Sequence, residues 1–212
     1  MLKDKVLEAL IIWMLSMISL TLSGFIKMQG YIYSTIVSQT ALAIPSIIYL
    51  AVRREVLLSM LKSIKNLRIK YVMLIALFVW GVGSILTSIQ DRICPPPSWY
   101  IEKIESFTPS NFIELILAIL LSWLLVAPIE EVLFRWVLLT PMIDYLGVKM
   151  GVILSALIFS ISHLDPWNVI SPFLIGLACG LLIAKNQSIL SAIIIHATHN
   201  TITISSMYFL SF

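Results

Sequence analysis

Three charged side chains lie close together in a strongly apolar part of the chain. Glu130, Glu131 and Arg135 belong to the segment 111–139, in which leucine, isoleucine and other apolar residues dominate. At the depth of a lipid bilayer each such charge costs about 2.5–3.5 kcal/mol even on lenient insertion scales. Charges in this setting therefore need a partner, water or a chemical role.

The helical spacing of these charges predicts which of them pair. Glu131 and Arg135 stand four residues apart with the acid on the N-terminal side, the favoured order for an ion pair on one helix face. Glu130 points about 100° away from Glu131 and has no such partner. Because burial disfavours the charged form of a carboxyl group, Glu130 is suited to exchange a proton near neutral pH. A purely structural ion pair is the alternative, and we favour a functional role.

Other polar groups at helix depth cluster in the last third of the chain. They are His163, Asp165, His196, His199 and Asn200. His196 and Asn200 are four residues apart and share one helix face, whereas His199 is turned away from it. A lone histidine in a membrane helix more often makes an interhelical hydrogen bond than it catalyses a reaction. Two histidines together with an unpaired glutamate favour a chemical role.

The composition identifies the class of protein that must position these groups. The 212 residues are 59% hydrophobic and only 12% charged, with a mean hydropathy of +1.00. A soluble domain would have about a quarter of its residues charged, and a transmembrane β-barrel would alternate apolar and polar positions. We therefore expect an all-α, polytopic transmembrane helical bundle. The two cysteines, Cys94 and Cys179, define neither a disulfide framework nor a metal cluster.

Continuous apolar runs predict about seven membrane spans in a single integral membrane domain, residues 1–212. They cover residues 6–23, 31–52, 71–89, 111–141, 147–162, 168–184 and 188–209. We expect Pro128 to kink the fourth span and Pro141 to end it. In the sixth, Gly176, Gly180 and Ala184 form a face of small residues that allows close helix packing.

The charged loops predict the orientation of the chain in the membrane. The segment 53–70 sets Lys62, Lys65 and Arg68 against apolar positions, which is typical of a basic amphipathic helix in the membrane interface. The excess of basic residues places it, with the N-terminus, in the cytoplasm. The loop 90–110 has no basic excess and is expected outside. The net charge of +3 thus bears on topology and lipid headgroups and does not indicate nucleic acid as a partner.

Four motifs, taken in chain order, resemble the signature motifs of the CAAX-protease and bacteriocin-processing family (CPBP or Abi, the type II CAAX prenyl endopeptidases). They are Glu130-Glu131-x-x-x-Arg135, Phe159-x-x-x-His163, Phe173-x-x-Gly176-x-x-x-Gly180 and His196-x-x-x-Asn200. The resemblance covers roughly residues 111–204, a motif-bearing core, and the first three spans carry no motif.

This resemblance implies an intramembrane endopeptidase acting on a membrane-anchored peptide or protein, with a prenylated CAAX-type sequence as one candidate. By similarity Glu130 and His163 would activate a water molecule, and His196 with Asn200 would stabilise the oxyanion. The ion pair of the fourth span would orient the site. In straight helices, however, Glu130 and His163 would lie toward opposite ends of their spans. They meet only if a helix tilts or the chain after His163 dips into the protein.

Three alternatives remain open at this point. Two histidines and a glutamate could hold zinc and leave a position for water, although the absence of an H-E-x-x-H helix ranks a metal below metal-free hydrolysis. Glu130, His163 and His196 could instead form the relay of a proton-coupled transporter, but the inverted repeats typical of transporters are not evident. A non-catalytic membrane scaffold or immunity protein would be favoured by loss of a motif, and all four are present.

Overall fold

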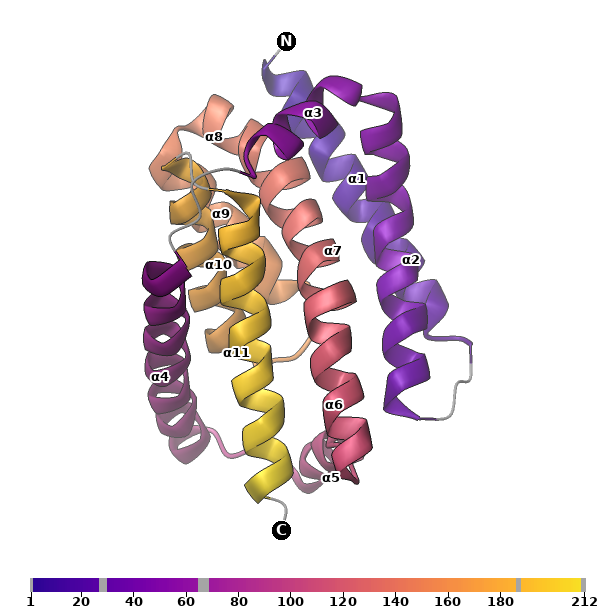
Figure 1. The fold of residues 1–212 in the computed structure, drawn as a ribbon, viewed down its shortest axis with the longest axis vertical. Helices are drawn as coiled ribbons and strands as arrows, with labels where there is room; N and C mark the ends of the chain where they lie inside the picture. Colours follow the sequence, from indigo (N-terminus) through magenta and orange to yellow (C-terminus); the bar gives the residue numbers. More distant parts are fainter. Residues whose placement is uncertain (1, 27–29, 65–68, 186–187, 211–212) are drawn as a thin grey trace.

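The computed structural model describes residues 2–26, 30–64, 69–185 and 188–210, and the secondary structure of this part of the chain is entirely helical (Figure 1). The all-α prediction is confirmed. In chain order the helices are α1 (Leu2–Ser23), α2 (Tyr31–Val52), α3 (Arg54–Lys62), α4 (Ile69–Ile93), α5 (Ser98–Phe107), α6 (Phe112–Leu121), the π-helical η1 (Ser122–Val126), α7 (Ala127–Glu131), the π-helical η2 (Val132–Leu139), α8 (Thr140–Leu146), α9 (Val148–Ile161), α10 (Ile170–Ala184) and α11 (Ile189–Leu210).

Several helices have the length and apolar composition that crossing a membrane requires. Four stretches qualify: Leu2–Ser23, Ile32–Val52, Ile69–Ile93 and Phe112–Leu146. The apolar helices α9 and α10 have only 14 and 15 residues. At about 1.5 Å per residue, α9 is about 21 Å long, less than the hydrocarbon core of about 30 Å. The total of seven spans therefore stays a prediction.

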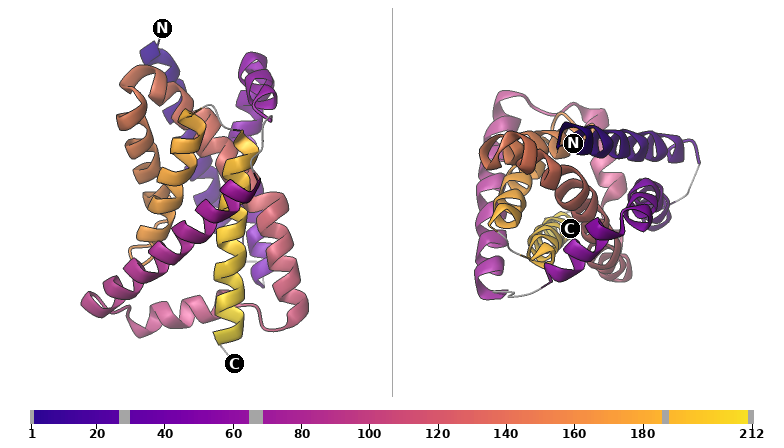
Figure 2. Two further views of the ribbon diagram at one scale, coloured as in Figure 1. Left: turned by 60° about the vertical axis from the view of Figure 1, so that its left-hand side comes forward. Right: turned by 90° about the horizontal axis from the view of Figure 1, so that it is seen from above.

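The helices form one bundle around α11. Helix α1 packs against α2, α9 packs against α10, and α11 contacts α4, α6, α7 and α10. Helix α4 runs at a steep tilt across the bundle, and α5 lies across its lower end (Figure 2). The N-terminus and α3 lie at one end of the molecule, and α5 and the C-terminus lie at the other (Figure 1).

The long helical stretch that carries the charges begins as predicted. The Asn111 side chain accepts a hydrogen bond from the Glu114 backbone N–H at 3.0 Å, and the Glu114 carboxylate accepts one from the Ser110 N–H at 2.9 Å. The first contact satisfies a backbone donor that the first helical turn leaves free, and the second holds Ser110, which precedes the cap residue. They fix where the helix starts.

The prediction that Pro141 ends this helix is wrong. The stretch continues through Pro141 to Leu146, and Gly147 ends it in the left-handed conformation, with φ 79°. The π-helical η2 precedes the proline, and there the Thr140 hydroxyl donates to the Arg135 carbonyl at 3.1 Å. The Thr140 hydroxyl thus gives the Arg135 carbonyl a hydrogen-bond donor close to Pro141, which has no backbone N–H of its own.

Two other predictions need correction. The segment 90–110 is not simply a loop, because it contains α5, whose residues Trp99 and Tyr100 pack against Trp167 with ring centroids 5.5 and 5.0 Å away. The basic amphipathic helix ends at Lys62 in the described chain. Its other basic residues, Lys65 and Arg68, lie outside the described residues.

The small-residue face of α10 packs directly on α9, as predicted. A Cβ atom at Gly176 would come within 2.8 Å of the Ala156 Cβ, and one at Gly180 within 3.1 Å of Val152 Cγ1. Larger side chains would push these helices apart. The glycines therefore hold in place the helix that leads to His163.

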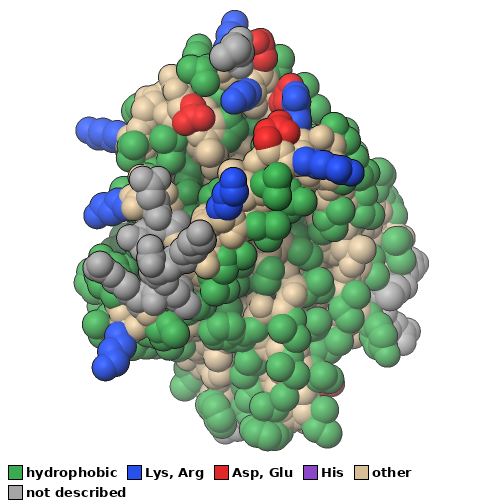
Figure 3. Space-filling model, turned by 45° about the horizontal axis from the view of Figure 1, so that its top comes forward, with side chains coloured by type: hydrophobic (Ala, Val, Ile, Leu, Met, Phe, Trp, Pro, Cys, Tyr) green, Lys and Arg blue, Asp and Glu red, His purple; other side chains and the backbone are tan. Residues whose placement is uncertain are grey.

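Charged side chains mark the two ends of the bundle. The end that carries the N-terminus and α3 gathers Lys, Arg, Asp and Glu side chains, and hydrophobic side chains cover the flanks below it (Figure 3). Basic residues on the elements at this end include Lys3, Lys5, Arg53, Arg54 and Lys62. The opposite end carries acidic residues of α5 and the start of α6, among them Glu102, Glu105 and Glu114. The opposite end also carries Arg92 and Lys103, so it is the larger number of basic residues at the end with the N-terminus that favours a cytoplasmic N-terminus.

We predict that α3 faces the cytoplasm and α5 the outside. In a variant whose native cysteines are replaced, a cysteine at Trp99 should react with an impermeant thiol reagent added outside intact cells. A cysteine at Ser63 should react only after the cells are opened. Native Cys94, which is exposed close to α5, is a second reporter for the same side. Labelling of position 63 from outside would reverse the orientation.

Candidate active site

A buried ion pair lies at the junction of α7 and η2. Glu131 Oε2 is 3.0 Å from Arg135 Nε, and both side chains are completely buried. The Arg135 guanidinium also stacks over the Phe159 ring, 4.6 Å from its centroid. The pairing predicted from the i, i+4 spacing is confirmed. An aromatic face supports the cation on a second side.

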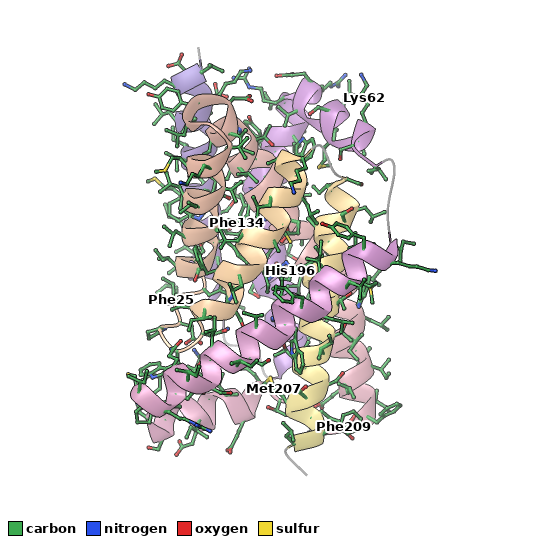
Figure 4. The ribbon with its side chains drawn as sticks, turned by 90° about the vertical axis from the view of Figure 1, so that its left-hand side faces the viewer. Phe25, Lys62, Phe134, His196, Met207 and Phe209 are labelled. Atoms are coloured by element: carbon green, nitrogen blue, oxygen red, sulfur yellow. The ribbon has the colours of Figure 1, made fainter. Side chains whose placement is uncertain are left out.

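Glu131 also binds His196 of α11, a contact that the sequence spacing did not indicate. His196 Nδ1 lies 2.9 Å from Glu131 Oε1, and the ring is buried near the middle of the molecule's length (Figure 4). A carboxylate can only accept, so Nδ1 carries the proton in this hydrogen bond. The other nitrogen, Nε2, is 3.8 Å from Glu130 Oε2. Glu131 thus fixes the His196 ring with Nε2 directed toward Glu130.

Glu130 and His163 line one cavity of about 190 Å³. Its wall is formed by Met17, Leu20, Gln39, Leu42, Glu130, Phe134, Ser162 and His163. Glu130 is largely buried, whereas His163 keeps much of its side chain exposed and so lies at the open side of the cavity. A mostly apolar wall with a few convergent polar groups is typical of a small-molecule or substrate site.

The short α9 explains why these two residues meet. Because α9 ends well before it could cross the bundle, its connection to α10 lies near the middle of the molecule's long axis (Figure 1). The chain reverses at Leu164, whose φ of 51° is left-handed and uncommon for a residue other than glycine. The chain after His163 does not dip into the protein as the sequence suggested, because most of its residues stay at the surface, with Leu164 73% exposed. The short α9 instead brings His163 to the level of Glu130.

Hydrogen bonds from other elements anchor this connection. Asp165 Oδ1 accepts the backbone N–H groups of Trp167 and Asn168, and Tyr100 of α5 donates its hydroxyl to Asp165 Oδ2 at 2.9 Å. Burial and this hydrogen bond raise the pKa of Tyr100 above its usual range. The α5 helix therefore braces the turn that carries His163.

Phe159 connects the two histidines. Its carbonyl accepts a hydrogen bond from His163 Nδ1 at 2.9 Å, so this histidine also keeps Nε2 for other partners. Its ring packs edge-on against both imidazoles, with centroids 4.9 Å from that of His163 and 5.7 Å from that of His196. The second motif thus orients both rings.

Asn200 and His199 lie one turn further along α11. Asn200 is half-buried on the face predicted to be shared with His196, and α11 is continuous over both positions. His199 is buried, and its Nδ1 has no hydrogen-bond partner among the described residues.

Within the described ranges, no group of three or more His, Cys, Asp or Glu side chains is arranged to hold a metal ion. The zinc set considered from the sequence, Glu130 with His163 and His196, therefore does not form a ready-made ligand group.

Sequence reasoning missed the contribution of the first two helices. Gln39 of α2 donates from Nε2 to Glu130 Oε1 at 2.8 Å, and Trp13 of α1 donates from Nε1 to Ser162 Oγ at 3.0 Å. The feature of the sequence that could have indicated a role for Gln39 is its amide side chain within an otherwise apolar span. Polar groups in such spans commonly bond across helices.

We predict that Glu131→Gln destabilises the protein by about 3–5 kcal/mol, because it leaves the buried Arg135 charge without its counter-ion. Glu130→Gln, which does not touch this pair, should cost much less. Unfolding of both variants in the same detergent measures the difference. Equal stability of the two variants would contradict the role assigned to the ion pair.

Comparison with known proteins identifies the segment that holds most of these groups. Residues 112–202 match the family model described as type II CAAX prenyl endopeptidase Rce1-like. The match includes Glu130, Glu131, His163, His196 and Asn200, and excludes α1 to α5. No curated protein and no solved structure matches the chain.

Proposed function

The chain belongs, through residues 112–202, to the Rce1-like family of type II CAAX prenyl endopeptidases, and we propose that it is an intramembrane endopeptidase. The observation that carries this proposal is the buried cluster of Glu130, Glu131 and His196 beside a cavity that His163 also lines. A carboxylate and an imidazole that line one small cavity, with a second imidazole 3.8 Å from the carboxylate, suit the activation of water for attack on a peptide carbonyl.

In the proposed reaction Glu130 is the general base. Glu130 Oε2 lies on the side of His196 and has no hydrogen-bond partner among the described residues, so it can accept a proton from water held in the cavity. His163, with its Nε2 left available by the Phe159 contact, would bind the same water or relay the proton to the leaving amine. Attack gives a tetrahedral intermediate with a negatively charged oxygen.

His196 and Asn200 are proposed to stabilise that oxygen. With Nδ1 bound to Glu131, His196 can donate from Nε2 only when both of its nitrogens carry protons. Nε2 is the nitrogen that Glu131 leaves available, and it lies 3.8 Å from Glu130 Oε2. A charged donor beside an amide donor is well suited to a developing oxyanion.

The proposed substrate is a membrane-anchored peptide or protein, with a prenylated CAAX-type sequence as the first candidate. The protein is proposed to lie in the bilayer as one multi-pass domain with about seven spans and a cytoplasmic N-terminus. The spanning-length helices and the basic end that carries α3 support this orientation.

Cleavage by the purified protein tests the proposal directly. We predict that wild type in detergent hydrolyses a peptide with a farnesylated cysteine followed by three residues, and that a chelator leaves the rate unchanged. Glu130→Gln should abolish hydrolysis, because the amide keeps the shape of the side chain but cannot accept the proton. Mass spectrometry of the products gives the rate and the bond that is cut. Equal turnover by wild type and Glu130→Gln would refute the assignment.

The roles of Asn200 and His199 can be separated in the same assay. We predict that Asn200→Ala lowers turnover by about 10²–10³-fold with little change in substrate affinity, as loss of an oxyanion donor does elsewhere. His199→Gln should retain near-normal turnover per folded molecule, because His199 lies off the face shared by His196 and Asn200. An active Asn200→Ala beside an inactive His199→Gln would show that the other face of α11 carries the chemistry.

A further inference from the structure

The side chain of Gln39 reaches the candidate base from outside the family-matched segment. Gln39 lies on α2, and its Nε2 donates to Glu130 Oε1 at 2.8 Å. Both side chains line the 190 Å³ cavity. Among the described residues, Gln39 alone donates a hydrogen bond to the Glu130 carboxylate, since His196 Nε2 stands 3.8 Å from the other oxygen.

The hydrogen bond from Gln39 determines which carboxylate oxygen of Glu130 is left to accept a proton. With Oε1 held by Gln39, Oε2 is the oxygen on the side of His196, and it is left without a partner in the described part of the chain. A carboxylate on a two-atom stem can otherwise rotate and exchange its oxygens. The amide therefore restricts the base to one orientation.

The carbonyl oxygen of the same Gln39 amide is evidence for a bound ligand. Gln39 Oε1 is buried, and no described residue donates a hydrogen bond to it. Buried carbonyl groups in proteins nearly always have a donor, and this one belongs to a residue that lines the cavity. A backbone N–H of a peptide in the cavity is a donor of the right kind.

We propose that Gln39 is a positioning and substrate-binding residue of this site: its NH₂ group orients Glu130, and its carbonyl oxygen accepts a backbone N–H of the bound peptide. The inference rests on the proposed peptidase function. It assigns a part of the site to the helices that precede the family-matched segment.

The first test replaces the amide with an apolar side chain of similar length. Gln39→Met should lower kcat for the farnesylated peptide by about 10²-fold, the cost expected when a reacting group is misplaced by about 1 Å. The matched control is Thr40→Val on the same helix, because the exposed Thr40 hydroxyl donates to the Ile36 carbonyl of its own helix and has no other hydrogen-bond partner among the residues that the structure describes. Its kcat should equal that of wild type.

Substrate binding by the carbonyl is tested with peptides that carry a single N-methyl group at successive positions. At one position the methyl group should raise KM for wild type and have little further effect on Gln39→Met, because the variant has already lost the acceptor. If the N-methyl group raises KM by the same factor in Gln39→Met as in wild type at every position, the binding part of the proposal is overturned.

A spectroscopic comparison tests the orienting role of Gln39 without relying on activity. The infrared carboxylate band that disappears in Glu130→Gln belongs to Glu130, and it should shift in Gln39→Met and stay in place in Thr40→Val. An unshifted band together with wild-type kcat would overturn the positioning role. If wild type cleaves no peptide, the proposed function fails, and the infrared comparison still decides whether Gln39 holds Glu130.

Discussion

The rest of the site depends on the two contacts of the Glu131 carboxylate. One of its oxygens pairs with Arg135 and the other accepts from His196, so a single buried group joins the α7–η2 stretch to α11. Moving such charges out of water costs several kcal/mol each, and only close pairing compensates for it. That requirement leaves few arrangements open to these helices, and the observed one directs His196 Nε2 toward Glu130.

The second histidine reaches the site by a different physical route. His163 does not pair with a carboxylate in the described structure; it is placed by the end of a short helix and by the turn that follows. Tyr100 anchors that turn through Asp165, and Trp13 binds Ser162. Elements without any family motif thus position a motif residue. The matched segment thus holds Glu130 and His163, while α1 and α2 supply other parts of the cavity wall.

The π-helical turns η1 and η2 lie on either side of α7, which carries Glu130 and Glu131. Widened turns of this kind are rare in helices and occur often at functional sites. Here they flank the pair Glu130 and Glu131, and carbonyls within η2 accept hydroxyl groups from Ser155 and Thr140. The helical stretch passes through both Pro128 and Pro141 without ending.

The sequence by itself determined the features that depend on local spacing and composition. The helical membrane class, the start of the charged helix at Asn111 and the pair between Glu131 and Arg135 all follow from residues close together in the chain. The close packing of α10 on α9 at Gly176 also follows, because missing side chains allow backbones to approach.

Only the tertiary structure decided which groups meet across helices. The bond between Glu131 and His196, the shared cavity of Glu130 and His163, and the contact from Gln39 depend on helix lengths, tilts and the turn after α9. The α5 helix was missed in the sequence because its ten residues mix polar and aromatic types and owe much of their order to packing against Trp167. Spacing along one helix fixes a direction around its own axis, whereas contacts between helices are set by how all the side chains fill the space between them.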